Sequence, residues 1–172
     1  MQGSSPAEAL NAYLSILHRV LSCVTREVLQ VASYQPADTP QSLFLNGFEQ
    51  ARLQSGQLPL ALRIAQQFQL ARLDDVPRSE RWRVTITEYH YAVEVPEPAG
   101  DEILAFHWHP ERRVIADRRL VSWPHLHIGD GELRRMHLTH RKHIPTQRVA
   151  MEDVLEFIID DAVTTGLEGH SG

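Results

Sequence analysis

The chain has 172 residues, an ordinary length for one domain, and 42% of them are hydrophobic, which is typical of a globular rather than a disordered protein. The single cysteine, Cys23, excludes an intrachain disulfide and favours a reducing compartment, so we expect a cytoplasmic protein. The chain opens without a charged-then-apolar leader and contains no run of about 18 apolar residues, so we expect no membrane partner.

The net charge is unevenly distributed along the chain. Its total of −5 argues against broad nucleic-acid binding. Residues 111–148, however, carry nine basic and four acidic side chains, a balance of +5 that leaves −10 for the rest. Because anions respond to the local potential, this window is compatible with RNA as a partner; the alternative is a solvated, arginine-rich surface.

The first 76 residues are predicted to be helical. Ser5 suits an N-cap, Pro6 the first helical position and Glu8 a capping box. A helix of roughly 25 residues is predicted from apolar positions spaced by three and four: Leu10, Tyr13, Leu14, Leu17, Val20, Leu21, Val24, Val28 and Val31. A second helix, from Thr39 and Pro40 to Gly56, and a third from Pro59 are predicted from two further apolar sets: Leu43, Phe44, Phe48 and Ala51, then Leu60, Ile64, Phe68 and Ala71.

From residue 81 the hydrophobic period changes to two, which predicts strands. Residues 81–95 and 102–109 are expected to form a hairpin and residues 122–128 a further strand, with a short strand or loop at 114–121 and a partly irregular stretch at 132–143. An amphipathic helix is predicted from Val149 to Val163, ending at Gly166. The expected fold class is α+β: N-terminal helices packed with a small antiparallel β-sheet and a C-terminal helix. We expect one domain over 1–172, helical over 1–76 and histidine-rich over 81–166.

Two His-x-His segments distinguish the second half of the chain. His107-Trp108-His109 and His125-Leu126-His127 both lie on predicted strands, where a period of two puts both histidines of a pair on one face. If the two strands are neighbours that share this face, four imidazoles converge. The alternative is that these histidines are surface or hydrogen-bonded residues of the sheet.

Converging imidazoles suit two kinds of chemistry. Neutral imidazole binds zinc and other divalent transition metals, for which the ligand set would be His107, His109, His125 and His127. Imidazole also titrates near neutral pH, so paired histidines can take a proton from a 2′-hydroxyl and give one to a leaving oxygen. Such RNA cleavage needs no cofactor, and its candidate catalytic residues are His107, His125 and His127.

The segment before the last predicted helix is a candidate anion site. Free backbone N–H groups and the helix dipole favour negative charge there, and an arginine can bind phosphate with two hydrogen bonds. We assign substrate or phosphate binding to Arg148 and His143, together with Tyr91 of the first predicted strand. The alternative for Arg148 is a surface residue flanking the helix.

Several segments of the second half occur in an order found in one protein family. They are Tyr89-His90-Tyr91, residues 102–107, Pro124-His125-Leu126-His127-Ile128-Gly129, and Ile144-Pro145-Thr146-Gln147-Arg148 followed by Met151-Glu152-Asp153-Val154-Leu155. Over residues 85–164 this order resembles the TumE-type toxin family of bacterial toxin–antitoxin systems. Phe106-His107-Trp108-His109 stands where the family usually has an Arg-Tyr-Asp-type segment. The resemblance implies a small toxin-like α+β fold, ribonuclease-like growth inhibition, a cognate antitoxin as partner, and functional roles for His125, His127 and Arg148.

Three hypotheses about function therefore stand side by side. The first is a toxin-like protein that cleaves or binds RNA through its histidines without a metal. The second is a metal-binding protein with imidazole ligands. The third is a non-catalytic module that self-associates through the apolar stripe of its predicted N-terminal helices.

Overall fold

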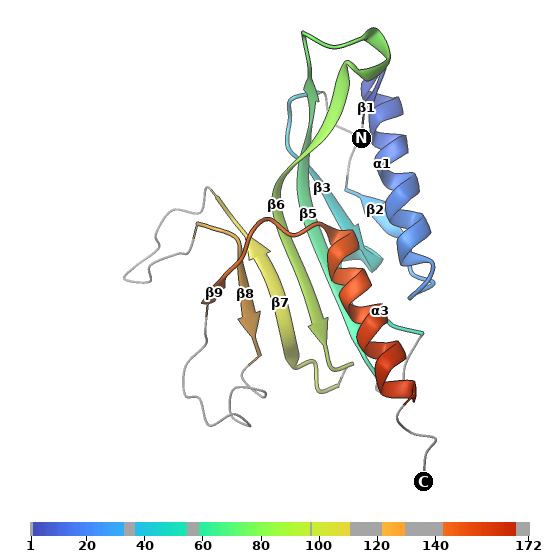
Figure 1. The fold of residues 1–172 in the computed structure, drawn as a ribbon, viewed down its shortest axis with the longest axis vertical. Coiled ribbons are helices and arrows are strands. Elements are labelled where there is room, and N and C mark those ends of the chain that lie inside the picture. Colours follow the sequence, from blue (N-terminus) through green and yellow to red (C-terminus); the bar gives the residue numbers. More distant parts are fainter. Residues whose placement is uncertain are drawn as a thin grey trace.

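The fold is an antiparallel sheet with two helices on one of its faces (Figure 1). The structure is a computed structural model that describes residues 2–32, 37–54, 59–96, 98–110, 122–129 and 143–167, with side chains up to Ile159. Its elements in chain order are β1 (Gln2–Gly3), α1 (Pro6–Leu21), β2 (Leu29–Val31), β3 (Gln41–Leu45), β4 (Ala51–Arg52), β5 (Ala61–Arg72), β6 (Trp82–Glu94), β7 (Glu102–Trp108), β8 (His125–Ile128), β9 (His143–Pro145) and α3 (Met151–Leu167), with short 3-10 helices at Asn46–Phe48 and Arg78–Glu80.

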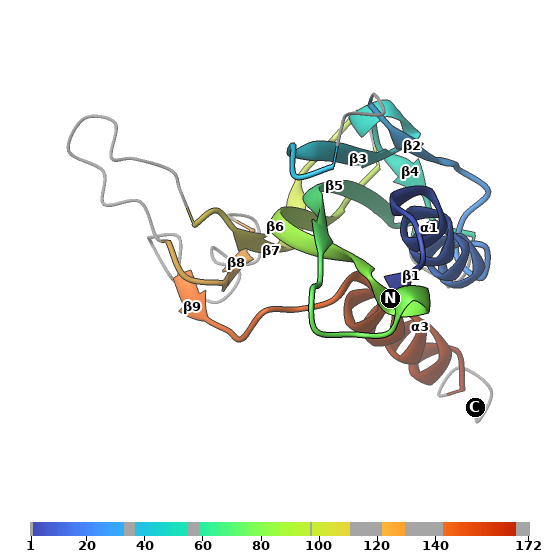
Figure 2. The same cartoon turned by 90° about the horizontal axis from the view of Figure 1, so that it is seen from above.

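Most strands pair with the strand that follows them along the chain. Within the described residues the strand order is β2-β3-β5-β6-β7-β8-β9, while β4 pairs with β5 and β1 pairs with the first residues of β6. Figure 2 shows α1 and α3 beside β1 to β6, whereas β8 and β9 extend away from both helices. Neither described helix is long and apolar enough to cross a bilayer.

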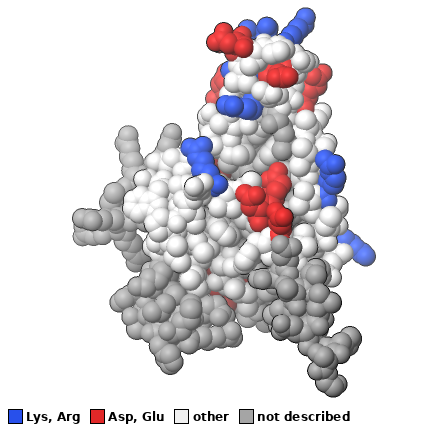
Figure 3. Space-filling model, viewed as in Figure 1, with Lys and Arg blue, Asp and Glu red and all other residues white. Residues whose placement is uncertain are grey.

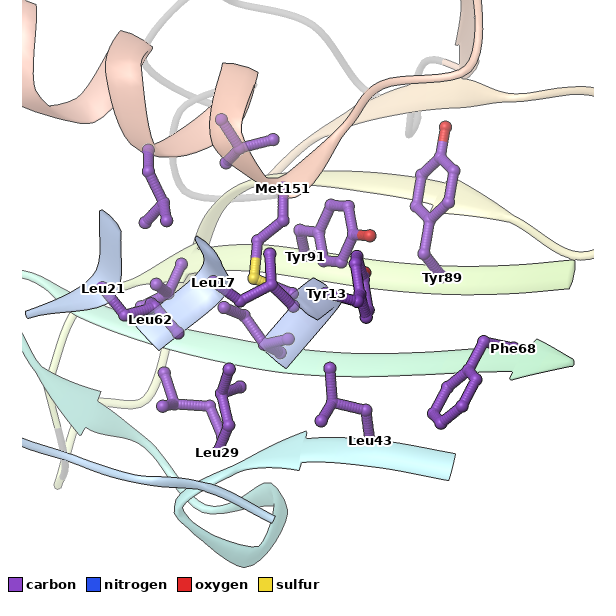
Figure 4. Close-up of a cluster of buried hydrophobic side chains, with 14 of the residues drawn as sticks. Tyr13, Leu17, Leu21, Leu29, Leu43, Leu62, Phe68, Tyr89, Tyr91 and Met151 are labelled. Carbon is purple, nitrogen blue, oxygen red and sulfur yellow. The ribbon is translucent and has the colours of Figure 1, made fainter. Parts of the chain in front are cut away.

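The core lies between the helices and the sheet (Figure 4). Alternate residues of β5 point to the helices, so Leu62, Ile64 and Phe68 are fully buried. The helices close the core with one apolar side each, made of Ala9, Leu10, Tyr13, Leu17 and Leu21 from α1, and Met151, Val154, Leu155 and Ile158 from α3.

One polar side chain, Gln66, lies inside this core. Its Nε2 donates to the Tyr13 hydroxyl, and its Oε1 accepts a hydrogen bond from the Tyr91 hydroxyl. Burial raises the pKa of Tyr13 to about 12 and raises the pKa of Tyr91 well above its usual 10. Tyr91 is therefore a core residue on the helix side of the sheet.

The predicted fold class is wrong because the molecule is dominated by its sheet. The sheet is large, with nine strands in the described residues, and α1 is the one α-helix described in the first 76 residues. The second predicted helix is replaced by β3 and β4, and the third by β5. The predicted N-terminal helix is also too long, since α1 ends at Leu21 and β2 begins at Leu29.

The pattern of β5 explains the error. Leu60, Ile64 and Phe68 are four residues apart, a spacing shared by a helical face and by alternate positions of a strand. The buried positions Leu62 and Leu70 fill in the period of two. After α1, the Thr25 hydroxyl donates to the Arg52 carbonyl, which ties this segment to β4 instead of continuing the helix.

The elements predicted elsewhere agree with the structure. Ser5 caps α1 by accepting a hydrogen bond from the Glu8 N–H, and Pro6 begins the helix. The hairpin of residues 81–109 is β6 and β7, the strand of residues 122–128 contains β8, and α3 is the expected last helix. The predictions for residues 114–121 and 132–142 lie outside the described residues.

A β-bulge in β6 decides which side chains face the helices. The pairing of β5 with β6 shifts register between Gln67 and Phe68, so Trp82, Val84 and Ile86 lie on the same face as Tyr89 and Tyr91. Strict alternation would have put His90 on the face of Trp82. The bulge instead leaves His90 on the face away from the helices.

Candidate metal centre

The sheet face opposite the helices gathers histidines from four successive strands. Cross-strand register places His90 opposite His107, His107 opposite His125, and His127 opposite His143. Side chains of directly opposite residues lie on the same face. We call this surface the histidine face; among the described residues it contains His90 of β6, His107 of β7, His109 directly after β7, His125 and His127 of β8, and His143 of β9.

The two His-x-His segments lie on neighbouring strands and share this face. The ring centre of His107 lies 5.6 Å from that of His125, 4.4 Å from that of His127 and 5.7 Å from that of His109. The four imidazoles considered as a ligand set therefore converge. The structure places His125 and His127 in one cluster and His107 in another, each with residues from other strands, while His109 lies outside both.

The first cluster consists of His125, His127 and His143. One ligand nitrogen from each lies within 4.8 Å of the others, and His127 Nε2 is 3.0 Å from His143 Nδ1. The ring centres are 4.4, 4.8 and 4.9 Å apart. In a tetrahedral zinc site with bonds of roughly 2.0–2.1 Å, ligand nitrogens lie about 3.4 Å apart and imidazole centres about 5 Å apart. The spacing of the three imidazoles is thus close to that of ligands of one ion.

The backbone before β8 fixes the orientation of His125. Its Nδ1 lies 2.8 Å from the carbonyl oxygen of Trp123, and a carbonyl can only accept, so Nδ1 carries the proton. In the neutral form of the ring, Nε2 is then the unprotonated nitrogen. A backbone carbonyl that orients a histidine in this way is the usual outer-shell support of a metal ligand.

No family model matches the chain, and no curated protein or solved structure gives a significant match. The similarity to TumE-type toxins therefore stays a hypothesis that rests on the sequence motifs.

The second cluster consists of His90, Glu102 and His107. Their ligand atoms also lie within 4.8 Å of one another, and the rings of His90 and His107 are stacked with centres 4.2 Å apart. Burial lowers the pKa of His107 to about 2, and the neighbouring imidazoles of His90, His127, His109 and His125 add to this effect. His107 is therefore neutral at physiological pH, the form that binds a metal.

His109 is oriented by a carboxylate. Its Nδ1 lies 2.7 Å from Glu88 Oε1, and its Nε2 lies 3.5 Å from His107 Nδ1. If Nδ1 of His109 donates to Glu88, its Nε2 accepts from Nδ1 of His107. His107 then presents an unprotonated Nε2, a buried atom with no hydrogen-bond partner. His109 thus supports His107.

The predicted phosphate-binding residues do not meet the candidate catalytic histidines as a group. His143 joins them, but Tyr91 is buried on the other side of the sheet. Arg148 lies over Trp108, 3.8 Å from the ring centre, and Trp108 alternates with His107 and His109. The arginine therefore packs on the face away from the histidines.

The helix that follows Arg148 brings its own negative charge. Figure 3 shows acidic side chains over the beginning of α3, whose first turn contains Glu152 and Asp153. Asp153 Oδ2 accepts a hydrogen bond from the Ala150 N–H. The Asp153 carboxylate therefore binds a backbone N–H at the helix start, where a phosphate was expected.

Two members of these clusters were not among the residues selected from the sequence. His90 lies next to Tyr91 on a predicted strand, but one histidine in a strand carries no signal of its own. Glu102 begins the second strand of the predicted hairpin, and only the register of that hairpin brings it to the histidines. His137 and His140, which continue the three-residue spacing of His143, lie outside the described residues.

Proposed function

We propose that this protein binds a divalent transition-metal ion of the zinc class through His125, His127 and His143. The observation that carries the proposal is the spacing of the three imidazoles, whose ring centres lie 4.4 to 4.9 Å apart. Three imidazoles leave the fourth tetrahedral position to water or to a substrate atom, as in hydrolytic zinc sites. His143 is exposed, so a ligand can approach the ion from its side of the cluster.

The donor set also fits this class of metal. Imidazole suits zinc, copper, nickel and iron, whereas calcium and magnesium prefer oxygen ligands. The hydrogen bond from His125 Nδ1 to Trp123 supports the nitrogen that would bind the ion.

The test is a titration of the untagged protein with Zn²⁺, and with Co²⁺ as a spectroscopic substitute. We expect binding that gives tetrahedral Co²⁺ absorption bands, and the His143→Ala variant should bind at this site about tenfold more weakly or worse. His18→Ala changes an exposed histidine of α1 and is the matched control, with unchanged affinity expected. Equal affinity in the wild type and His143→Ala would exclude the cluster as the binding site.

Metal-independent RNA cleavage is the second candidate function. It is supported by the 3.0 Å contact between His127 Nε2 and His143 Nδ1, since two imidazoles that share one proton can supply a base and an acid. The similarity to TumE-type toxins adds RNA and a cognate antitoxin as partners of this candidate.

A cleavage assay with and without chelator separates the two candidates. Cleavage that persists in chelator and disappears in a folded His127→Ala variant would favour the acid–base mechanism. Activity that requires the added ion would assign the reaction to the metal site, because the metal then supplies the nucleophilic hydroxide. RNA that stays intact under both conditions would exclude the second candidate.

A further inference from the structure

The second cluster, formed by His90, Glu102 and His107, brings two strands and three donor atoms together on the histidine face. His90 and His107 are cross-strand neighbours of β6 and β7. All three residues are partly buried, and their ligand atoms lie within 4.8 Å of one another. The cluster combines two imidazoles with a carboxylate, whereas the first cluster contains imidazoles alone.

A second β-bulge turns Glu102 toward the histidines. Val93 pairs with Leu104, but Glu94 pairs with Glu102, so the register shifts between these two pairs. With strict alternation, Glu102 would share the face of Leu104, which packs against the core. The shift places Glu102 with Glu94 on the histidine face.

The backbone directly after β8 contacts this bulge. The Gly129 N–H donates to the Ile103 carbonyl at 2.8 Å. A Cβ atom at Gly129 would lie 1.5 Å from the carbonyl oxygen of Glu102, so no side chain fits at this position. The position of Glu102 therefore depends on close contact between the strands that carry the two clusters.

The contacts around His107 are compatible with a metal ligand. If Nδ1 of a neutral His109 donates to Glu88, its Nε2 accepts the proton of His107 Nδ1, which leaves Nε2 of His107 unprotonated. This Nε2 is buried and makes no hydrogen bond. A buried nitrogen without a partner is destabilising, and coordination to an ion would satisfy it. A carboxylate behind an imidazole is also a common support of metal ligands.

We propose that His90, Glu102 and His107 form a second binding site for a divalent first-row transition metal, so that the histidine face holds two ions. Two imidazoles and one carboxylate are a donor set for iron(II), manganese and zinc. The sites adjoin, since the His107 ring lies 4.4 Å from that of His127. The inference extends the proposed function, because both assume metal binding on this face, but it uses three different ligands.

The two sites should differ in their affinity for metal because their ligands differ in charge. The carboxylate of Glu102 offsets part of the charge of the second ion, which the all-imidazole cluster cannot do. Two dications in adjoining sites repel each other, so the second binding step is weaker than it would be alone. A titration should therefore resolve two successive steps.

The test combines calorimetric titration with Zn²⁺ and elemental analysis of the untagged, dialysed protein. We expect two equivalents in the wild type and in His18→Ala, one in Glu102→Gln, and one in His143→Ala. Glu102→Gln preserves the shape of the side chain, so folding should be retained, which circular dichroism can check. Each variant keeps one site, and the Co²⁺ spectra of these two sites should differ. The site left in His143→Ala has a carboxylate ligand, whereas the site left in Glu102→Gln has imidazoles alone.

The outcomes distinguish this inference from the proposed function. If the wild type binds one equivalent of Zn²⁺ and Glu102→Gln binds the same amount, the second site is overturned and the first remains. Suppose that the wild type binds one equivalent of Zn²⁺, which Glu102→Gln loses and His143→Ala retains. This result would support the second site and reject the first. Wild-type protein that binds no metal would overturn both.

Discussion

At the scale of single residues, proton positions decide what the histidines can do. His125 is oriented by the Trp123 carbonyl and His109 by the Glu88 carboxylate. In the neutral form of each ring, an acceptor at Nδ1 leaves Nε2 as the unprotonated nitrogen. A sequence reveals only that imidazoles are present, whereas the acceptor beside each ring selects its tautomer.

Gly129 is the residue on which the relative position of the two clusters depends. We expect Gly129→Ala to reduce the free energy of unfolding by about 1–3 kcal/mol, because its Cβ would collide with the backbone of Glu102 and push β8 from β7. The displacement should also weaken metal binding. Urea denaturation and Zn²⁺ titration measure the two effects.

Gly47 provides the control for this substitution. It has a φ of 64° and lies outside the histidine face, and a Cβ there would meet only Gln30, at 3.7 Å. Gly47→Ala should cost about 1–2 kcal/mol through backbone strain while Zn²⁺ affinity is unchanged. Equal losses of affinity in both variants would show that the close approach of Gly129 is not what positions the ligands.

At the scale of elements, bulges and register decide which residues meet. The hairpin of β6 and β7 could be predicted because its residues alternate and are rich in β-branched and aromatic types. Its two bulges could not be predicted, because the inserted residue of a bulge is not marked by its amino-acid type. These bulges nevertheless place His90 and Glu102 on the histidine face.

In the N-terminal strands β3 and β5, buried polar residues hide the alternating pattern from the sequence. In β3, the buried positions Gln41, Leu43 and Leu45 alternate, but a polar residue among them hides the period. In β5, Gln66 interrupts the apolar series in the same way, although Tyr13 and Tyr91 satisfy its amide in the core. A buried polar residue of this kind is intelligible only when its partners from other elements are known.

At the scale of the whole molecule, the helices and the histidines occupy opposite faces of the sheet. The buried positions of α1 face the sheet of the same chain, so the apolar stripe considered for self-association is largely used in the core. β8 and β9 extend beyond the helices (Figure 2). The core can therefore be tested separately from the two clusters of the histidine face.

Alkaline pH provides such a test of the core. Tyr13 keeps its proton up to a pKa of about 12 when folded, but loses it near 10 when unfolded. The stabilisation is complete below pH 10 and is lost as the pH rises toward 12. We expect the free energy of unfolding to fall by about 1 kcal/mol from Tyr13 alone between pH 10 and 11, with a further fall from Tyr91.

Urea denaturation from pH 8 to 11 measures this fall, and absorbance titration of tyrosinate identifies the groups. The chain has one lysine, Lys142, so lysine titration contributes little in this range. Tyr13→Phe should show a smaller decrease than the wild type. A wild-type stability that stays constant up to pH 11 would contradict the burial of both hydroxyls.

The sequence by itself determined the start of α1, the β6–β7 hairpin, the last helix and the sharing of a face within each His-x-His pair. Caps and periods are local, so they can be recognised without knowledge of the fold. Only the tertiary structure decided that β5 is a strand, that Arg148 packs on Trp108, and that His143, His90 and Glu102 join the histidines. The physical reason is that periodicity assigns residues to a face of one strand, whereas hydrogen-bond register and bulges between strands decide which faces and side chains meet.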